Sequence, residues 1–121
     1  MRCLRFAIAV LSLVAGLPAI ASAHAVLRKA SPAAGAVLKQ SPPEIRLQFN
    51  ENIEPRFSRI ELTAEKGGKI DTGPASPDLQ SRSQILVTVP PLAPGTYKVK
   101  WLALSVDSHK VQGEFTFQIV P

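Results

Sequence analysis

The sequence is nearly devoid of sulfur. Its 121 residues include one cysteine, Cys3, and one methionine, Met1, and both stand at the very start of the chain. The rest of the chain can therefore form no disulfide, and it contains no soft sulfur ligand for a metal ion. A disulfide-stabilised scaffold and a cysteine-based metal or redox centre are both excluded for that part.

Aromatic residues are also few, with five phenylalanines, one tryptophan and one tyrosine. The 14 lysines and arginines outnumber nine acidic residues, but they are scattered and are not interleaved with aromatics. A nucleic-acid-binding surface normally concentrates basic residues on one face or along one element. The pattern therefore favours an ordinary solvated surface and predicts no nucleic-acid partner.

The only long apolar run lies at the N-terminus. Two arginines precede the apolar residues 6–15, and Ala21-Ser22-Ala23 has the small-x-small form that signal peptidase recognises. A membrane anchor would need a longer unbroken run than this one, which is interrupted by glycine and proline. We predict that residues 1–23 are a cleaved signal peptide. The exported domain, residues 24–121, would then begin at His24 and carry a net charge of +3.

The exported part has the patterning of an all-β protein. No window of helical length carries apolar residues at helical spacing, whereas apolar and polar residues alternate with the period of two that is typical of half-buried strands. Glycine- and proline-rich turns separate these stretches, so the sequence predicts one Greek-key β-sandwich. The alternating stretches are residues 45–49, 60–62, 85–89, 97–103 and 115–119.

Two segments carry more specific structural expectations. Glu65 to Ser83 is polar and rich in glycine and proline, so we expect an excursion between strands with at most one short strand, at Lys69–Asp71. Tyr97 follows Leu92-Ala93-Pro94-Gly95 in the manner of a tyrosine corner, where the phenol bonds to the backbone upstream. Trp101, four residues later, is expected to fill the core.

Asp107 and His109 are the candidate metal ligands near the C-terminus. They stand two residues apart between segments expected to be strands, Gly95–Leu104 and Glu114–Val120, so an extended backbone would place both side chains on one face. The only other histidine, His24, would offer an imidazole and a free α-amine after cleavage. Nitrogen donors with a carboxylate in a tetragonal set suit Cu(II). Composition and spacing alone leave two interpretations open, a copper site and a solvated turn.

Longer motifs resemble one family. The start His24-Ala25-Val26-Leu27 with Ser31-Pro32-Ala33-Ala34-Gly35 resembles the opening of the CopC family of periplasmic copper-binding proteins. Residues 47–58, the Asp107-x-His109 motif, and the residues around Trp101 and Phe117 are similar to later blocks of that family. The resemblance spans essentially residues 24–121.

The resemblance implies a cupredoxin-like or immunoglobulin-like sandwich or barrel of about seven strands. It implies one Cu(II) per chain, held by His24 through its amine and ring together with Asp107 and His109, with Glu51 close by as a supporting group. The implied role is that of a periplasmic carrier or buffer rather than an enzyme. It would not itself span the membrane, and it would deliver copper to a CopD-like inner-membrane transporter.

Two departures from the family pattern bear on these expectations. Relatives often have Asp-Gly-His-Pro where this chain has Asp107-Ser108-His109-Lys110, which puts the shape of the turn in question. Some members also carry a methionine-rich Cu(I) site in the segment that corresponds to residues 65–83, which here contains no Met, His or Cys. The chain is therefore expected to bind Cu(II) only.

Two other functions remain as alternatives. One is an oxidative copper enzyme like the lytic polysaccharide monooxygenases, which also bind copper through an N-terminal histidine and a second histidine. The chain is short for that class and poor in aromatics, and Asp107 would fill a position that oxygen chemistry needs open. The other is a metal-free, immunoglobulin-like binding module. Copper titration distinguishes the metal-free module from the rest, and reductant-driven oxidation of a polysaccharide distinguishes the enzyme from the carrier.

Overall fold

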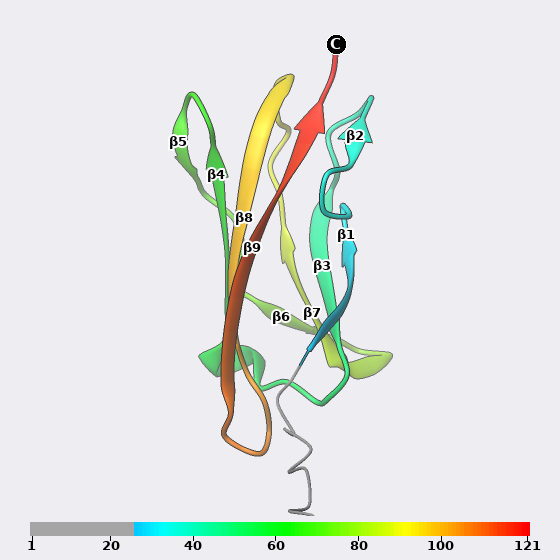
Figure 1. The fold of residues 1–121 in the computed structure, drawn as a ribbon, viewed down its shortest axis with the longest axis vertical. Coiled ribbons are helices and arrows are strands. Elements are labelled where there is room, and N and C mark those ends of the chain that lie inside the picture. The colour runs from blue at the N-terminus through cyan, green and yellow to red at the C-terminus, as the bar shows by residue number, and fades with distance from the viewer. Residues whose placement is uncertain (1–25) are drawn as a thin grey trace, which may run out of the picture.

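A computed structural model describes residues 26–121, which form two β-sheets packed face to face (Figure 1). The expected all-β sandwich is confirmed. The expected signal peptide, residues 1–23, and His24 lie outside the described residues. The elements are β1 (Leu27–Ser31), β2 (Val37–Leu38), β3 (Glu44–Phe49), the 3-10 helix η1 (Pro55–Phe57), β4 (Arg59–Ala64), β5 (Gly68–Ile70), β6 (Ser76–Asp78), β7 (Ser81–Thr88), β8 (Gly95–Leu104) and β9 (Lys110–Ile119).

The chain crosses repeatedly between the two sheets. One sheet has the strand order β1-β3-β7-β6 and the other β2-β9-β8-β4-β5, and all neighbours are antiparallel except β2 and β9. The described residues contain more strands than the expected seven or so, because β2, β5 and β6 are short pieces of two or three residues. In the described part of the chain, no helix is long and apolar enough to span a bilayer.

The core lies between the sheets and follows the alternating pattern of the sequence. In β3, for example, Ile45, Leu47 and Phe49 are buried while the residues between them are only partly covered. Tyr97 stacks on Phe117 with ring centroids 5.6 Å apart, and its hydroxyl donates a hydrogen bond of 2.5 Å to the Ala93 carbonyl. This bond to the backbone upstream is the contact expected of a tyrosine corner.

Trp101 lies at the margin of this core rather than in its centre. It is half-buried, and its ring meets Phe49 edge-on with centroids 5.3 Å apart. The indole lies against Gly113, its partner across the β8–β9 ladder, so closely that a Cβ at Gly113 would be 2.6 Å from Cζ2 of the ring. The expectation of a core-filling tryptophan therefore holds only in part, because the ring occupies the side-chain space that Gly113 leaves empty.

The polar excursion of residues 65–83 contains two short strands instead of one. β5 pairs with β4, and β6 pairs with β7 on the other sheet, so the segment passes from one sheet to the other. Arg46 on β3 holds the far end of the excursion, since its guanidinium makes an ion pair with Asp78 and a second one of 2.8 Å with Glu44. A sequence pattern cannot show such strands, because short polar pieces carry too little alternation.

Candidate metal centre

The turn between β8 and β9, residues 105–109, carries the two expected ligands. Pairing of the two strands continues to Leu104 and Lys110, so β9 begins four residues earlier than the expected start at Glu114. Within the turn, the Ser105 N–H donates to the His109 carbonyl (2.9 Å) and the Ser108 N–H to the Ser105 carbonyl (3.0 Å). The backbone is thus a tight turn, whereas the sequence analysis assumed an extended conformation for Asp107 and His109.

Asp107 and His109 nevertheless come together. Nδ1 of His109 lies 3.1 Å from Oδ2 of Asp107, and the side chains are 47% and 40% exposed, so both can be reached from solvent. Nitrogen and oxygen ligands bound at right angles, each about 2.0–2.1 Å from one ion, lie about 2.9 Å apart. The two side chains are hydrogen-bonded to each other at this separation, which would also suit adjacent positions around a single metal ion.

Ser105 lies beneath this pair. Its side chain is 1% exposed, its hydroxyl donates to Oδ1 of Asp107, and its oxygen accepts from the His109 N–H at 3.3 Å. The Ser105 hydroxyl, followed by His109, lowers the pKa of the Asp107 carboxyl from its usual value because both favour the ionised form. The sequence gives no indication of this role for Ser105, since its burial and these bonds exist only in the folded turn.

The segment that follows β3 supports the turn from the other side. The Val106 N–H donates to the Asn52 carbonyl (3.1 Å), and Ile53 forms an isolated bridge with Ser105. The Glu54 N–H donates to the Leu104 carbonyl at 2.8 Å. Residues 52–54 therefore fix the base of the turn against the end of β8.

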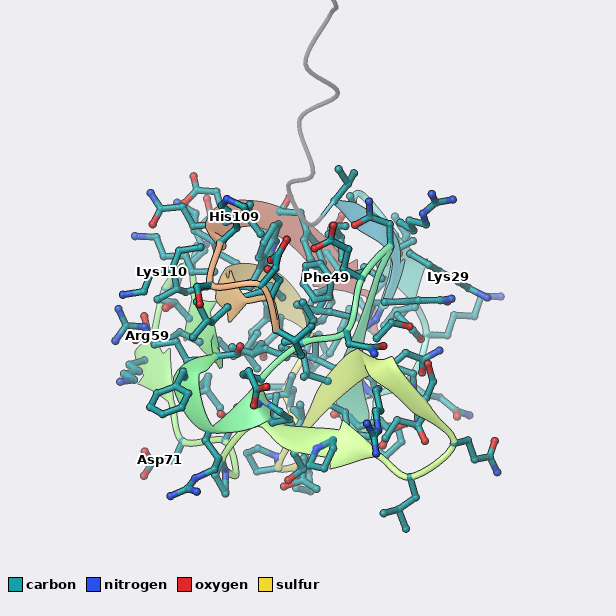
Figure 2. All side chains as sticks on the ribbon, turned by 90° about the horizontal axis from the view of Figure 1, so that it is seen from below. Lys29, Phe49, Arg59, Asp71, His109 and Lys110 are labelled. Carbon is teal, nitrogen blue, oxygen red and sulfur yellow. The ribbon has the colours of Figure 1, made fainter. Side chains whose placement is uncertain are left out.

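The same segment also binds the start of the described chain. Oδ1 of Asn50 accepts from the Val26 N–H at 2.6 Å, and the Asn50 N–H donates to the Val26 carbonyl at 3.1 Å. The beginning of β1 and the 105–109 turn thus lie at one end of the sandwich, opposite the C-terminus (Figure 1). In Figure 2, which views this end, Phe49 at the end of β3 lies between His109 and Lys29 of β1.

Glu51 stands between the two asparagines that make these connections, and its side chain is half-buried. It lies in the segment that connects the start of β1 with the 105–109 turn. Asn50 and Asn52 themselves were not identified from the sequence. The sequence shows only two asparagines shortly after a strand, and this pattern is typical of an ordinary turn.

The described residues alone do not complete a metal site. In residues 26–121, no group of three or more histidine, cysteine, aspartate or glutamate side chains is arranged to hold a metal ion. A metal ion bound by Asp107 and His109 would therefore need further donors from outside this part of the chain. His24, the other candidate ligand, lies outside the described residues.

Comparison with known proteins gives consistent matches. The family model of the CopC domain matches residues 27–120. Protein YobA of Escherichia coli K12 is 40% identical over 119 residues, which cover 98% of this chain and 95% of that protein. Copper resistance protein C of Escherichia coli is 32% identical over 114 residues, covering 88% of this chain and 90% of that one. The crystal structure of CopC from Methylosinus trichosporium OB3b aligns with a TM-score of 0.76 and 32% identity, covering 81% of this chain and 95% of its own.

Proposed function

Because the chain belongs to the CopC family, we propose that it is an exported protein that binds one Cu(II) ion and carries or buffers copper in the periplasm. The observation that carries the proposal is the Asp107–His109 pair, with Nδ1 and Oδ2 3.1 Å apart in an accessible turn. The name of the related copper resistance protein C supports the choice of metal.

His24 would supply the remaining donors. Two residues of extended chain span at most about 7 Å, and Val26 is held by Asn50, in the segment that also supports the turn. Removal of residues 1–23 as a signal peptide would leave domain 24–121 with a free α-amine on His24, next to its imidazole. The amine, the two imidazoles and the Asp107 carboxylate would then make up a set of four donors.

The chemistry of this set selects the oxidation state. Nitrogen donors with one carboxylate suit the tetragonal geometry of Cu(II), whereas Cu(I) prefers sulfur ligands. No sulfur residue follows Cys3 in the sequence. We therefore assign Cu(II) as the bound ion and no retained Cu(I) site. Glu51, half-buried at the same end, would support the ligands rather than join them.

A carrier fits this arrangement better than an oxidative enzyme. The four donors fill the tetragonal positions that a catalytic centre would have to leave open. Among the described residues, Phe57 is the only exposed aromatic side chain, so no flat aromatic face is available for a polysaccharide. The acceptor of the copper would be a membrane transporter of the CopD type, as the family relationship suggests.

The test compares two forms of the N-terminus. One form begins at His24 and the other carries one additional glycine, which converts the α-amine into a peptide nitrogen and moves the new amine one residue away. We expect the extended form to bind Cu(II) more weakly by more than about 100-fold, because loss of a ligand exceeds the 10–100-fold typical of an outer-sphere partner. Competition against a Cu(II) chelator measures the affinities, and electron paramagnetic resonance counts the nitrogen ligands.

Point variants extend the test to the turn. Asp107→Ala and His109→Ala should each weaken binding without unfolding the domain, since both side chains are exposed. Asp71→Ala removes an exposed carboxylate in the β5–β6 connection and serves as the matched control with unchanged affinity. Equal affinities for the native and extended termini would disprove the role of the amine, and unchanged binding by His109→Ala would remove that residue from the site.

A further inference from the structure

We propose that Ser105 is a positioning residue that assembles the Asp107–His109 pair before the metal arrives. The inference rests on the proposed function and deepens it, because it concerns how the same site acquires its affinity. Ser105 would bind no metal. Its hydroxyl would fix the orientation of one ligand and the backbone of the other.

Ser105 occupies a buried position at the base of the turn. It directly follows the last residue of β8, it forms a bridge with Ile53, and its side chain is 1% exposed. Buried hydroxyls in folded proteins almost always find hydrogen-bond partners. Here every side-chain partner of Ser105 belongs to the two candidate ligands, Asp107 and His109.

The hydroxyl of Ser105 divides its hydrogen bonds between the two residues of the pair. A serine hydroxyl has one proton to donate, and the charged Oδ1 of Asp107 is the stronger acceptor near it, so the proton goes to the carboxylate. The oxygen in turn accepts from the His109 N–H at 3.3 Å. One buried atom is therefore hydrogen-bonded to both residues of the pair.

The hydrogen bond from Ser105 fixes the orientation of the Asp107 carboxylate. With Oδ1 bound to Ser105, Oδ2 faces Nδ1 of His109 at 3.1 Å. The carboxylate cannot rotate freely, and it presents a single oxygen to an incoming ion. Ligands held in their bound geometry lose less conformational entropy on binding, which raises affinity without adding a contact to the metal.

Ser58, which contacts the end of β8, provides a matched control. Ser58 is also buried, 8% exposed, and its hydroxyl donates to the Glu54 carbonyl (2.7 Å) while accepting from the Leu104 N–H (3.0 Å). It supports the end of β8 much as Ser105 supports the turn, but neither of these hydrogen bonds goes to a candidate ligand. Loss of either hydroxyl should reduce the stability of the fold, and only loss of Ser105 should disturb the pair.

The experiment uses the protein with His24 as its first residue and Cu(II) as the probe. We expect Ser105→Ala to lower Cu(II) affinity by about 10–100-fold, the range typical of groups that orient metal ligands, and Ser58→Ala to change it less than about twofold. In the copper-free protein, amide hydrogen exchange at Ser108 and His109 should become faster in Ser105→Ala than in Ser58→Ala. Equal affinity in Ser105→Ala and wild type, or equal losses in both variants, would overturn the proposal.

Two further comparisons keep the test decisive. If Ser105→Ala does not fold, Ser105→Thr and Ser105→Val form a pair of nearly equal volume that differs in the hydroxyl. The threonine variant should then bind Cu(II) about 10–100-fold more tightly than the valine variant, and equal binding would refute the role. If the wild-type protein itself retains no Cu(II), the proposed function fails. The exchange rates of the copper-free proteins then still show whether Ser105 orders the pair.

Discussion

Replacing Gly113 by alanine should destabilise the protein by about 1–2 kcal/mol. The new Cβ would be 2.6 Å from Cζ2 and 2.8 Å from Cε2 of Trp101, whereas carbon atoms in ordinary contact are about 3.5–4.0 Å apart. The indole would have to move by about 1 Å. Overpacking of this kind costs about 1–3 kcal/mol, and restriction of the unfolded chain by alanine returns about 0.4–1 kcal/mol.

Because the indole is half-buried, we expect the cost of overpacking to fall in the lower part of its range. Trp101 contacts Phe49 edge-on on its inner side, and its partial exposure leaves room to move outward. Outward movement would loosen the Phe49 contact and expose more of the indole to water. Because Trp101 is the only tryptophan, its emission reports this movement directly, and the emission maximum of the variant should shift to longer wavelength.

Thermal or urea unfolding measures the loss of stability. For a domain of this size, 1 kcal/mol corresponds to about 4–8 °C in the melting temperature. A double-mutant cycle isolates the contact: in a Trp101→Ala background, Gly113→Ala should be neutral or stabilising. Gly67→Ala is the control, since its Cβ would meet only the Ala64 Cβ, at 3.3 Å, and it should change stability by less than about 0.5 kcal/mol. A Gly113→Ala cost that persists without the indole would refute the explanation.

Three further predictions concern the turn and the tyrosine corner. Ser108 has a φ of 73°, a conformation that costs an L-residue about 1–2 kcal/mol, so Ser108→Gly should raise the free energy of unfolding by up to about 1 kcal/mol after the entropic cost of glycine; a lower urea midpoint would contradict this. Copper affinity should fall as pH drops from about 8 to 5, where α-amines and imidazoles gain protons, while the Asp107 carboxyl, its pKa lowered by Ser105 and His109, stays ionised. If competition titrations show that the copper affinity does not change between about pH 8 and 5, nitrogen ligands are excluded. Tyr97→Phe should cost about 0.5–1.5 kcal/mol through loss of its bond to the Ala93 carbonyl, and an unchanged melting temperature would show that water replaces it.

The sequence by itself predicted the fold class and the strands that have an apolar face. The strand Gly95–Leu104 was predicted with the bounds that the structure has, because its alternation is long and regular. The tyrosine corner was predictable for a similar reason, since Tyr97 bonds to a carbonyl only four residues away. The Asp107-x-His109 pair could also be identified as a candidate site, because the two residue types and their spacing are local properties of the chain.

The tertiary structure alone decided how the pair is held. The extended backbone assumed for Asp107 and His109 is in fact a turn, and the buried Ser105 is hydrogen-bonded to both residues. The supporting bonds join Val106 to Asn52, and Asn50 to Val26, across 54 and 24 positions of sequence. No local pattern encodes contacts at such separations, because they depend on which strands pair and in which register. The early start of β9 and the contact of Trp101 with Gly113 follow from the register of the β8–β9 ladder, which the 105–109 turn and the buried faces of the two strands fix together.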